Sequence, residues 1–441
     1  MKDNRQGGSS IGIRSFLTAI GVIFALMVAT YILTLVIPNG HIPFLQWAAS
    51  PFLVLGAEGS GSLIAVIAFL LVIGGIFNSL DQCGLMKYML DRTVHRFGKV
   101  RYRLMAVILL FFMGMGTMIG SFEECVPLVP IVVALAVNLG WDALTGVAMS
   151  LLAAGCGFAA GVCNPFTVGV AQQLAGLPMF SGVWMRLLAF ALIYSLLFLF
   201  LRLYAKRIEK PLDDTAQMAF VRDKQMDRGL VCFVSILGLG IATILCSGFI
   251  PELQDLTMII VAVMFLLAGV SATLVSGMKA GKLGKTALQG VVNILPAVLM
   301  ILMASSIKYT LEEAQILDTM LENAVSLAQT LPNWVVILFI YLIVLVMNFF
   351  IPSGSAKAFM LMPLIVPLAQ VFGISPQLCV LAFAFGDGFS NVFYPTNPAL
   401  LISLGLAKVG YGQWVKWSWK FQTCNLLLTS LLLLLGLVVG Y

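Results

Sequence analysis

Two stretches of this sequence, 233 positions apart, repeat one pattern of helix-breaking residues inside apolar segments. The first stretch runs from Gly120 to Gly176, and the second runs from Ser353 to Ala407. At this offset Pro130 aligns with Pro363, Gly140 with Gly373, Gly155 with Gly388, and Asn164-Pro165 with Asn397-Pro398. In a bilayer, backbone outside a helix is tolerated only where it is buried in protein or lines a wet cavity. The pattern therefore predicts two matched helix breaks that form a polar site within the membrane.

The composition is that of a protein that crosses a membrane several times. Hydrophobic residues make up 61% of the 441 residues and charged residues only 10%, whereas soluble domains contain about 25% charged residues. We therefore interpret the net charge of +6 through membrane topology and expect no nucleic-acid partner. The eight cysteines form no CxxC pair, which favours small buried apolar residues over disulfides or a zinc site. The first apolar segment is too long for a signal peptide, so we expect it to remain as a span.

The apolar segments predict an all-α polytopic membrane protein. A transmembrane helix needs about 20 apolar residues, and nine segments reach that length. They are residues 14–37, 61–79, 141–176, 182–203, 229–248, 256–276, 287–306, 376–407 and 414–440. The segments 141–176 and 376–407 are broken spans, which we expect to open at Gly155 to Pro165 and at Gly386 to Pro398. Residues 104–139 and 333–372 are interrupted by polar residues near their middle, so we predict re-entrant hairpins that enter and leave on one side.

The basic residues favour one orientation of these spans. A cytoplasmic N-terminus also places the basic clusters at 87–103, 202–228, 279–285 and 408–420 in the cytoplasm, as the positive-inside rule requires. Arg186 and Lys308 lie near outer ends and are exceptions to the rule. The C-terminus is then extracytoplasmic. All seven tryptophans lie near predicted segment ends, as in an interfacial aromatic belt.

The two copies of the repeat are predicted to have opposite orientations, because the chain crosses the membrane an odd number of times between them. Such inverted repeats are typical of secondary transporters. We assign residues 1–203 to the first repeat and residues 229–441 to the second. Residues 204–228 form a charged cytoplasmic connecting loop between them.

The breaks bring together groups that can bind a solute or an ion. Half-helix N-termini favour carboxylates, and free carbonyl oxygens coordinate cations such as sodium. A single hydroxyl often bonds to its own helix, but two matched clusters favour binding. The predicted solute-binding residues, to which Ser390 adds a hydroxyl, are Ser121, Glu123, Glu124, Asn164, Pro165, Thr167, Ser353, Gly354, Ser355, Lys357, Asn391, Thr396 and Asn397.

Four charged residues at the breaks need partners, since a charge at the membrane centre costs about 2.5–3.5 kcal/mol. Glu123 and Glu124 point about 100° apart on a helix, so one of them faces the site or both lie near cytoplasmic water. Asp387 is a cation ligand, a proton carrier or the N-cap of a half-helix. Lys357 pairs with a solute carboxylate or a glutamate, or it extends to the outer interface.

No enzymatic signature is present in the sequence. GxSxG, HExxH and Cys/His metal spacings are all missing, so an intramembrane hydrolase would have neither nucleophile nor metal. We therefore expect no catalytic activity and no cofactor apart from a coupling ion.

The hairpins, the broken spans with Asn-Pro and the inverted second copy resemble the ion transporter superfamily. The strings GTMIGSFEE and YPTNP are similar to the four-carbon dicarboxylate carrier (DcuC-like) group, and within it to the YfcC-like branch. The resemblance covers essentially the whole chain. It implies a homodimer in the bacterial inner membrane, with a fixed scaffold domain and a transport domain that moves like an elevator.

The resemblance also implies cation sites at the two hairpin tips, with the solute between them. Ser121 and Asn164 would serve the first site, and Ser353, Ser355, Asn391 and Asn397 the second. With Asp387 included, the predicted sodium ligands are Ser121, Asn164, Ser355, Asp387 and Asn391. The tips read Ser-Phe-Glu and Ser-Gly-Ser here, which departs from the Ser-Asn-Thr signature of sodium-coupled dicarboxylate carriers. The coupling ion is therefore either sodium or a proton.

We expect a secondary active transporter, either a symporter or an antiporter, of a small carboxylate-bearing metabolite. The acids Glu123, Glu124 and Asp387 beside Lys357 favour an amino acid. If these acids instead serve the coupling ions, a dicarboxylate fits as well. The alternative is a Na+/H+-type cation exchanger without an organic substrate.

Overall fold

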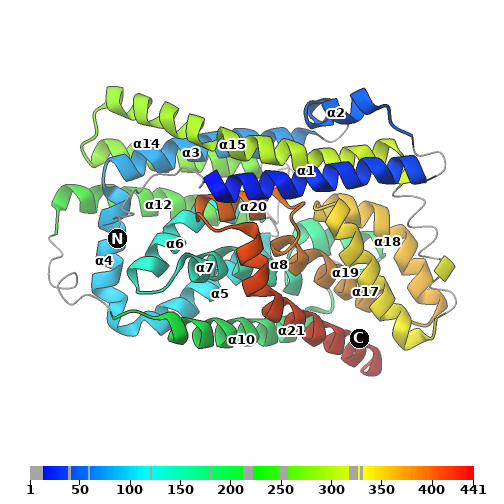
Figure 1. Cartoon of the computed structure of the whole chain (residues 1–441). Coiled ribbons are helices and arrows are strands. Elements are labelled where there is room, and N and C mark those ends of the chain that lie inside the picture. The colour runs from blue at the N-terminus through cyan, green and yellow to red at the C-terminus, as the bar shows by residue number, and fades with distance from the viewer. Residues whose placement is uncertain are drawn as a thin grey trace.

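We analysed a computed structural model of the chain, which describes residues 13–37, 41–57, 60–119, 122–178, 180–211, 222–247, 257–316, 326–327 and 331–441. Every regular element in these residues is a helix, which confirms the predicted all-α class. Figure 1 shows the longest helices running in similar directions, in two layers. One layer lies along the top of the view, and the other, which contains both matched stretches, lies below it.

The upper layer consists of helices outside the matched stretches. They are α1 (Ile13–Val36), α2 (Phe44–Leu53), α3 (Gly61–Gln82), α12 (Lys224–Ser247), α14 (Thr257–Val275) and α15 (Ala280–Glu313). Helix α3 packs against α14 and α15, and α1 packs along α15. A Cβ atom at Gly290 would lie 2.1 Å from the carbonyl oxygen of Gly74. Glycines thus let α3 and α15 approach closely, as small residues do between membrane helices.

The lower layer carries the two copies of the repeated pattern. In the first half it contains α4 (Leu85–Phe97), α5 (Arg101–Ile119), α6 (Val129–Asn138), α7 (Ala143–Val147), α8 (Ala153–Ala160), α9 (Val170–Leu174) and α10 (Val183–Ile208). In the second half it contains α17 (Asn333–Phe350), α18 (Gly354–Val371), α19 (Pro376–Gly388), α20 (Pro398–Leu406) and α21 (Tyr411–Val438). Short 3-10 and π-helical turns complete it: η1 (Val54–Gly56), η2 (Gly98–Val100), η3 (Glu123–Leu128), η4 (Ala148–Leu152), η5 (Pro165–Gly169) and η6 (Phe389–Val392).

Several helices are long and apolar enough to cross a membrane. Among the described side chains these are Leu85–Met118, Ala143–Ala160, Val183–Ile208, Gly354–Val371 and Tyr411–Val438, and the two parts of α15, bent by 40°, add a sixth if they form one span. Helices α1, α3, α12 and α14 have 24, 22, 24 and 19 residues, which also suffices to span. Parts of their side chains lie outside the described set, so the count of nine spans stays a prediction.

Both matched stretches contain a helix break, but each break begins later than the sequence analysis placed it. Gly155 lies inside α8, which ends only at Gly161 with a positive φ of 51°. Gly386 lies inside α19, which ends at Gly388. A Cβ atom at Gly155 would lie 2.6 Å from Val392, and one at Gly386 would lie 2.7 Å from Val344. These two glycines therefore permit close helix packing and do not unwind the helix.

Contacts in the lower layer repeat reciprocally under the shift of 233 positions. Gly155 faces Val392, and Gly388 faces Ala159, where its Cβ atom would lie 2.1 Å from the Cα atom. The shift carries the first pair onto the second with the partners exchanged, because Gly155 aligns with Gly388 and Ala159 with Val392. The contact of α6 with α20 likewise becomes that of α18 with α9, with the partners exchanged. Within each copy the packing also repeats, since α5 packs along α8 as α17 packs along α19. Exchange of partners is the mark of a two-fold relation between two units.

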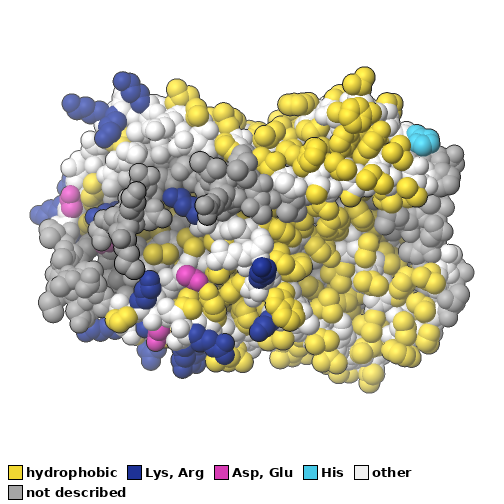
Figure 2. Space-filling model, viewed as in Figure 1, with side chains coloured by type: hydrophobic (Ala, Val, Ile, Leu, Met, Phe, Trp, Pro, Cys, Tyr) yellow, Lys and Arg dark blue, Asp and Glu magenta, His cyan; other side chains and the backbone are white. Residues whose placement is uncertain are grey.

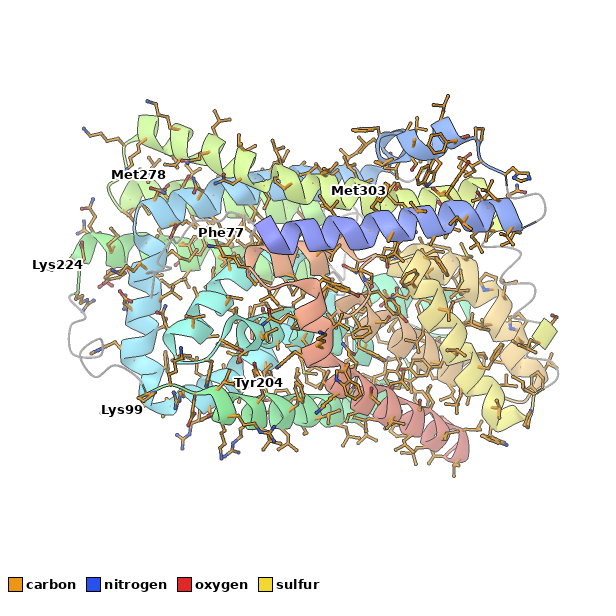
Figure 3. The ribbon with its side chains drawn as sticks, in the orientation of Figure 1. Phe77, Lys99, Tyr204, Lys224, Met278 and Met303 are labelled. Carbon is orange, nitrogen blue, oxygen red and sulfur yellow. The ribbon has the colours of Figure 1, made fainter. Side chains whose placement is uncertain are left out.

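Basic residues gather at one end of the molecule (Figure 2). Lys99 and Lys224 both lie there, as Figure 3 shows. At this end Asp227 accepts hydrogen bonds from Tyr88 at 2.6 Å and from Arg222 at 2.5 Å, and it also pairs with Arg92. These contacts tie α4 to the start of α12.

The connecting loop predicted over residues 204–228 is shorter in the structure. Helix α10 continues to Ile208, and α12 already begins at Lys224. The charges of Arg202, Lys206 and Arg207 do not prevent the helix, because cations near a helix C-terminus are favourable. Residues 212–221 of the loop lie outside the described residues.

We predict that adding a single methyl group to α5, at Gly116, would push this helix away from α8. A Cβ atom at Gly116 would lie 2.0 Å from the carbonyl oxygen of Ala154, whereas one at Gly114 meets nothing within 4 Å. Gly116→Ala should therefore destabilise the protein by about 1–3 kcal/mol, as overpacking does. Gly114→Ala is the matched control and should leave stability unchanged or slightly higher. Thermal unfolding in detergent measures both, and equal stability of the two variants would contradict the packing described here.

Candidate functional site

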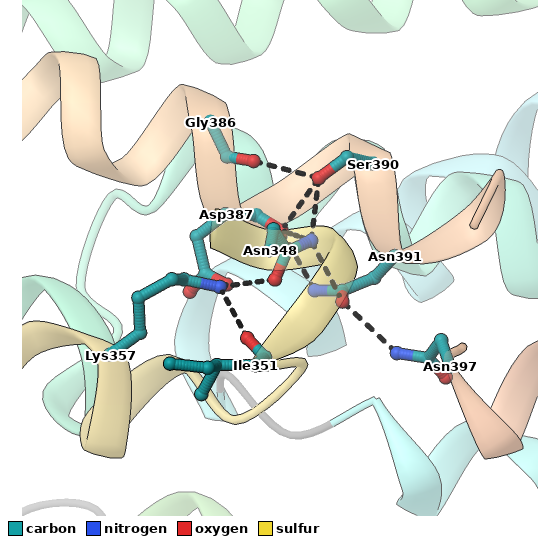
Figure 4. A network of polar contacts seen from close by, with 8 residues as sticks. All are labelled: Asn348, Ile351, Lys357, Gly386, Asp387, Ser390, Asn391 and Asn397. Carbon is teal, nitrogen blue, oxygen red and sulfur yellow. Dashed lines mark hydrogen bonds and ion pairs between the residues drawn. The ribbon is translucent and has the colours of Figure 1, made fainter. Parts of the chain in front are cut away.

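A buried ion pair joins α18 to α19 in the second matched stretch. Lys357 stands in the first turns of α18, and Asp387 stands in the last turn of α19. The Lys357 Nζ atom lies 2.7 Å from Asp387 Oδ1, and neither side chain is exposed. Figure 4 shows this pair as part of a network of polar contacts around Asn348. Such a pair is costly to desolvate and is kept only with good geometry and further hydrogen bonds.

The Lys357 ammonium group donates to three oxygen atoms. Besides Asp387 Oδ1 it reaches the carbonyl oxygen of Ile351 at 3.1 Å and Oδ1 of Asn348. The Ile351 carbonyl is available because α17 ends at Phe350, and Ile351 follows with a φ of −122°. All three ammonium donors are therefore used. The acceptors are a carboxylate, an amide and a backbone carbonyl, the kinds of oxygen that bind cations at broken helices.

Asn348 connects α17 to α19 and η6. Its Nδ2 atom lies 3.1 Å from the Asp387 carbonyl oxygen, 2.6 Å from Ser390 Oγ and 3.1 Å from Asn391 Oδ1. The sequence analysis missed this residue. The available signal was a lone asparagine near the end of an otherwise apolar helix, NWVVILFIYLIVLVMNFF.

Asn391 and Asn397 complete the network on the other side of the second break (Figure 4). Asn391 Nδ2 donates to the Asp387 carbonyl oxygen at 2.7 Å, and Asn397 Nδ2 donates to Asn391 Oδ1 at 3.0 Å. Asn391 Oδ1 thus accepts from both Asn348 and Asn397, which uses its two lone pairs. Ser390 Oγ donates to the carbonyl oxygen of Gly386 at 2.7 Å.

The two Asn-Pro pairs cap the helical segments that follow the breaks. Asn397 Oδ1 accepts from Leu400 N at 3.3 Å, and Asn164 Oδ1 accepts from Thr167 N at 3.2 Å. Both bonds run from the asparagine to the third residue after it, the usual N-cap geometry. Pro398 is the first residue of α20, and proline fits this position because its missing N–H has no helical partner there.

The two breaks meet at Gly354, the first residue of α18. A Cβ atom at Gly354 would lie 2.3 Å from Thr167 Cγ2 of the first break and 2.5 Å from Asp387 Oδ2 of the second. Thr167 Oγ1 and Asp387 Oδ2 are both buried and have no hydrogen-bond partner among the described residues. Buried polar atoms without partners are rare and indicate a water, an ion or a ligand. The tight space at Gly354 explains why no side chain fills this place.

Three predicted acidic and hydroxyl residues of the first matched stretch lie wholly or partly outside the described residues. Ser121 lies outside the described residues. Glu123 and Glu124 lie in η3, and their side chains are not described. The two orientations considered for these glutamates therefore both stay open.

The remaining predicted residues differ in how deeply they are buried. Pro165 begins η5, and its side chain is not described. Ser353 is exposed and Ser355 is partly exposed, whereas Lys357 is buried. Thr396 is buried, and its Oγ1 atom has no partner among the described residues.

The described residues contain no cluster of three or more His, Cys, Asp or Glu side chains that could hold a metal ion. Two of the predicted sodium ligands already accept hydrogen bonds from other side chains of the protein. Asp387 Oδ1 accepts from Lys357, and Asn391 Oδ1 accepts from two amide groups. At Asp387 Oδ1 the positive charge comes from the Lys357 ammonium group, and at Asn391 Oδ1 both donors are neutral amides.

Known proteins resemble the chain over most of its length. A family model described as "DcuC: C4-dicarboxylate anaerobic carrier" matches residues 48–438. The Escherichia coli (strain K12) protein named "Putative basic amino acid antiporter YfcC" is 31% identical over 404 residues, which cover 86% of this chain and 79% of that protein. A Haemophilus influenzae protein is 27% identical over 389 residues, which cover 85% of this chain and 76% of that protein.

A solved structure also aligns with the chain. The Alcanivorax borkumensis YdaH transporter shares 18% identity, with 96% of this chain and 99% of that chain covered, at a TM-score of 0.49. The family model and the Escherichia coli relative confirm the resemblance found in the sequence, and they show that the chain belongs to the DcuC family of C4-dicarboxylate anaerobic carriers.

Proposed function

We propose that this membrane transporter is a secondary active transporter of a small carboxylate-bearing metabolite, and that the solute binds where the two helix breaks meet. One observation carries the proposal. The side chains of Asp387 and Thr167 come from different stretches and both lie against Gly354, through Asp387 Oδ2 and Thr167 Cγ2. Asp387 Oδ2 and Thr167 Oγ1 are both buried without a partner among the described residues. Discontinuous helices at a repeat interface are where transporters of this kind hold their substrates.

The proposal includes alternating access by two inverted repeats, over residues 1–203 and 229–441. The reciprocal contacts of Gly155 with Val392 and of Gly388 with Ala159 support a two-fold relation between the halves. The gathering of basic residues at one end (Figure 2) supports a cytoplasmic N-terminus and an extracytoplasmic C-terminus in the bacterial inner membrane. An elevator-like movement and a homodimer complete the proposal, and both come from the family resemblance.

An amino acid fits the described groups better than a dicarboxylate. Asp387 Oδ2 is a buried acceptor without a donor, and a solute ammonium or guanidinium group would supply one. A dicarboxylate would place a second anion beside this carboxylate, at a cost. The printed name of the Escherichia coli relative also refers to basic amino acids, whereas the family description refers to C4-dicarboxylates.

We further propose that Lys357 replaces a sodium ion at the second break. Its ammonium group already has three oxygen partners from Asn348, Ile351 and Asp387. A sodium ion at the same oxygens would face an adjacent positive charge. Coupling at this break would then use a proton or solute exchange and would not use sodium.

Cation exchange without an organic substrate is the second candidate. It would use the Asp387 carboxylate as the exchanging group, with Lys357 as its competitor. Exchange of this kind predicts proton flux driven by sodium alone. Dependence of the flux on an organic solute would exclude it.

Purified protein in liposomes tests the proposed function. Radiolabelled L-arginine, L-ornithine, succinate and acetate would be offered separately, with an imposed proton gradient, a sodium gradient or an internal unlabelled solute. We expect accumulation or exchange of at least one of them, and an amino acid first. If no carboxylate or amino acid moves under any gradient, the proposed function is wrong.

A further inference from the structure

Arg186 is a buried cation without a partner. It lies one turn into α10, near the outer end that the sequence analysis assigned to this helix. Its exposed fraction is 0%. None of the atoms Nε, Nη1 and Nη2 has a hydrogen-bond partner in the described part of the chain. The ion pairs found among the described residues do not include it either.

The surroundings of Arg186 place it beside the first break. Helix α10 packs against α8 and α21. Among the described residues, the Tyr441 hydroxyl and the Cys163 thiol interact electrostatically with the guanidinium, and neither is a carboxylate. Tyr441 already donates its hydroxyl proton to the Gly182 carbonyl oxygen at 2.7 Å. Cys163 directly precedes Asn164, the residue that caps the segment after the break.

A buried guanidinium group without a hydrogen-bond partner is unfavourable unless an anion binds to it. A buried charge left unpaired destabilises a protein strongly, and charged residues inside a membrane normally pair or face a cavity. Long basic side chains usually reach the interface to avoid this cost, but Arg186 is fully enclosed. Its guanidinium presents five donors in a planar fork, which matches the two oxygens of a carboxylate. A carboxylate-bearing ligand is therefore the partner that fits best.

We propose that Arg186 binds the carboxylate group of the transported solute beside the first break. This inference rests on the proposed function, and it restricts the substrate to solutes whose carboxylate group binds Arg186. The first break would supply the positive pole through Arg186, and the second break would supply the negative pole through Asp387. A solute with both an anionic and a cationic group, such as an amino acid, satisfies both poles.

Variants of Arg186 test the inference in the full-length protein in liposomes. Arg186→Gln removes the charge, Arg186→Met removes charge and donors, and Arg202→Gln changes an exposed arginine on the same helix as a control. Using whichever of L-arginine, L-ornithine or succinate the wild type moves, we expect Arg186→Gln to raise KM at least about 30-fold, as loss of a buried charged contact does. Arg202→Gln should leave KM unchanged. For an amino acid substrate, the methyl ester, which lacks the carboxylate charge, should bind both wild type and Arg186→Gln equally poorly.

Stability without solute supplies a second readout. If the guanidinium group has no partner in the absence of solute, Arg186→Met should unfold in solute-free buffer at the same temperature as the wild type or higher. The stabilisation that the solute gives the wild type should disappear in this variant. If both Arg186 variants fail to fold, Arg186 has a structural partner and the inference is wrong.

Failure of the inference is distinguishable from failure of the proposed function. A wild type that moves no solute overturns the proposed function. A wild type that transports while Arg186→Gln keeps its KM overturns only the role of Arg186. Chloride or phosphate that stabilises the wild type but not Arg186→Gln, with no organic solute doing so, would assign the site to a free anion and also overturn it.

Discussion

Asp387→Ala is expected to destabilise the protein by about 3–5 kcal/mol, because it leaves the Lys357 ammonium buried and without a counter-ion. Both side chains have exposed fractions of 0%, and the Nζ–Oδ1 distance is 2.7 Å. Lys357→Met should be similarly destabilising, since it leaves the Asp387 carboxylate unpaired. The double variant Lys357→Met/Asp387→Leu should regain most of the lost stability, because apolar residues of similar volume replace buried ion pairs at little or no cost.

Thermal or denaturant-induced unfolding in detergent measures this pattern. Lys308→Ala is the matched control, because the pair of Lys308 with Glu312 is partly exposed, at 3.1 Å. A pair of that kind contributes at most about 1 kcal/mol. Single variants of Lys357 and Asp387 that unfold like the control would show that this ion pair does not form inside the protein.

Lys357→Ala is expected to make the protein's stability depend on sodium. Removing the ammonium group leaves the Asp387 carboxylate, the Asn348 amide oxygen and the Ile351 carbonyl oxygen around one space. Sodium binds such oxygens at broken helices. Sodium at 100 times its Kd would return about 2.7 kcal/mol to the variant, which is most of the stability lost with the lysine. The wild type should show no such effect at this break.

The measurement compares unfolding temperatures in sodium chloride and choline chloride at equal ionic strength. Lys308→Ala serves again as the control and should respond to sodium as the wild type does. A sodium effect that is present in the wild type and disappears in Lys357→Ala would contradict the proposal. It would mean that the lysine supports a sodium site and does not replace it.

The repeated helix-breaking residues correctly predicted that the chain leaves the helical conformation at two matched places. Asn164 and Asn397 stand outside helices and cap the segments that follow, as two matched breaks require. The exact start of each break was not predictable from the sequence. A glycine can end a helix, or it can stay in the helix and let a neighbouring helix pack closely against it. Gly155 and Gly386 do the latter, since Val392 and Val344 occupy the space where their side chains would be.

The composition of the site was only partly predictable. Lys357, Asp387, Asn391 and Asn397 were recognisable because polar residues in apolar segments need partners. Which partners they find depends on packing between helices far apart in sequence. Asn348 and Arg186 were missed for this reason, since one lies outside the repeated stretches and the other was attributed to an outer interface.

Solute counterflow in proteoliposomes, compared between the wild type and the folded double variant Lys357→Met/Asp387→Leu, tests most directly whether the solute is held where the broken helices meet. Protein that has passed the unfolding test would be reconstituted at equal amounts, and exchange of labelled for unlabelled solute would be followed. The wild type should exchange the solute, and the double variant should not exchange it at all despite its intact fold. Exchange by the double variant at the wild-type rate would contradict the account.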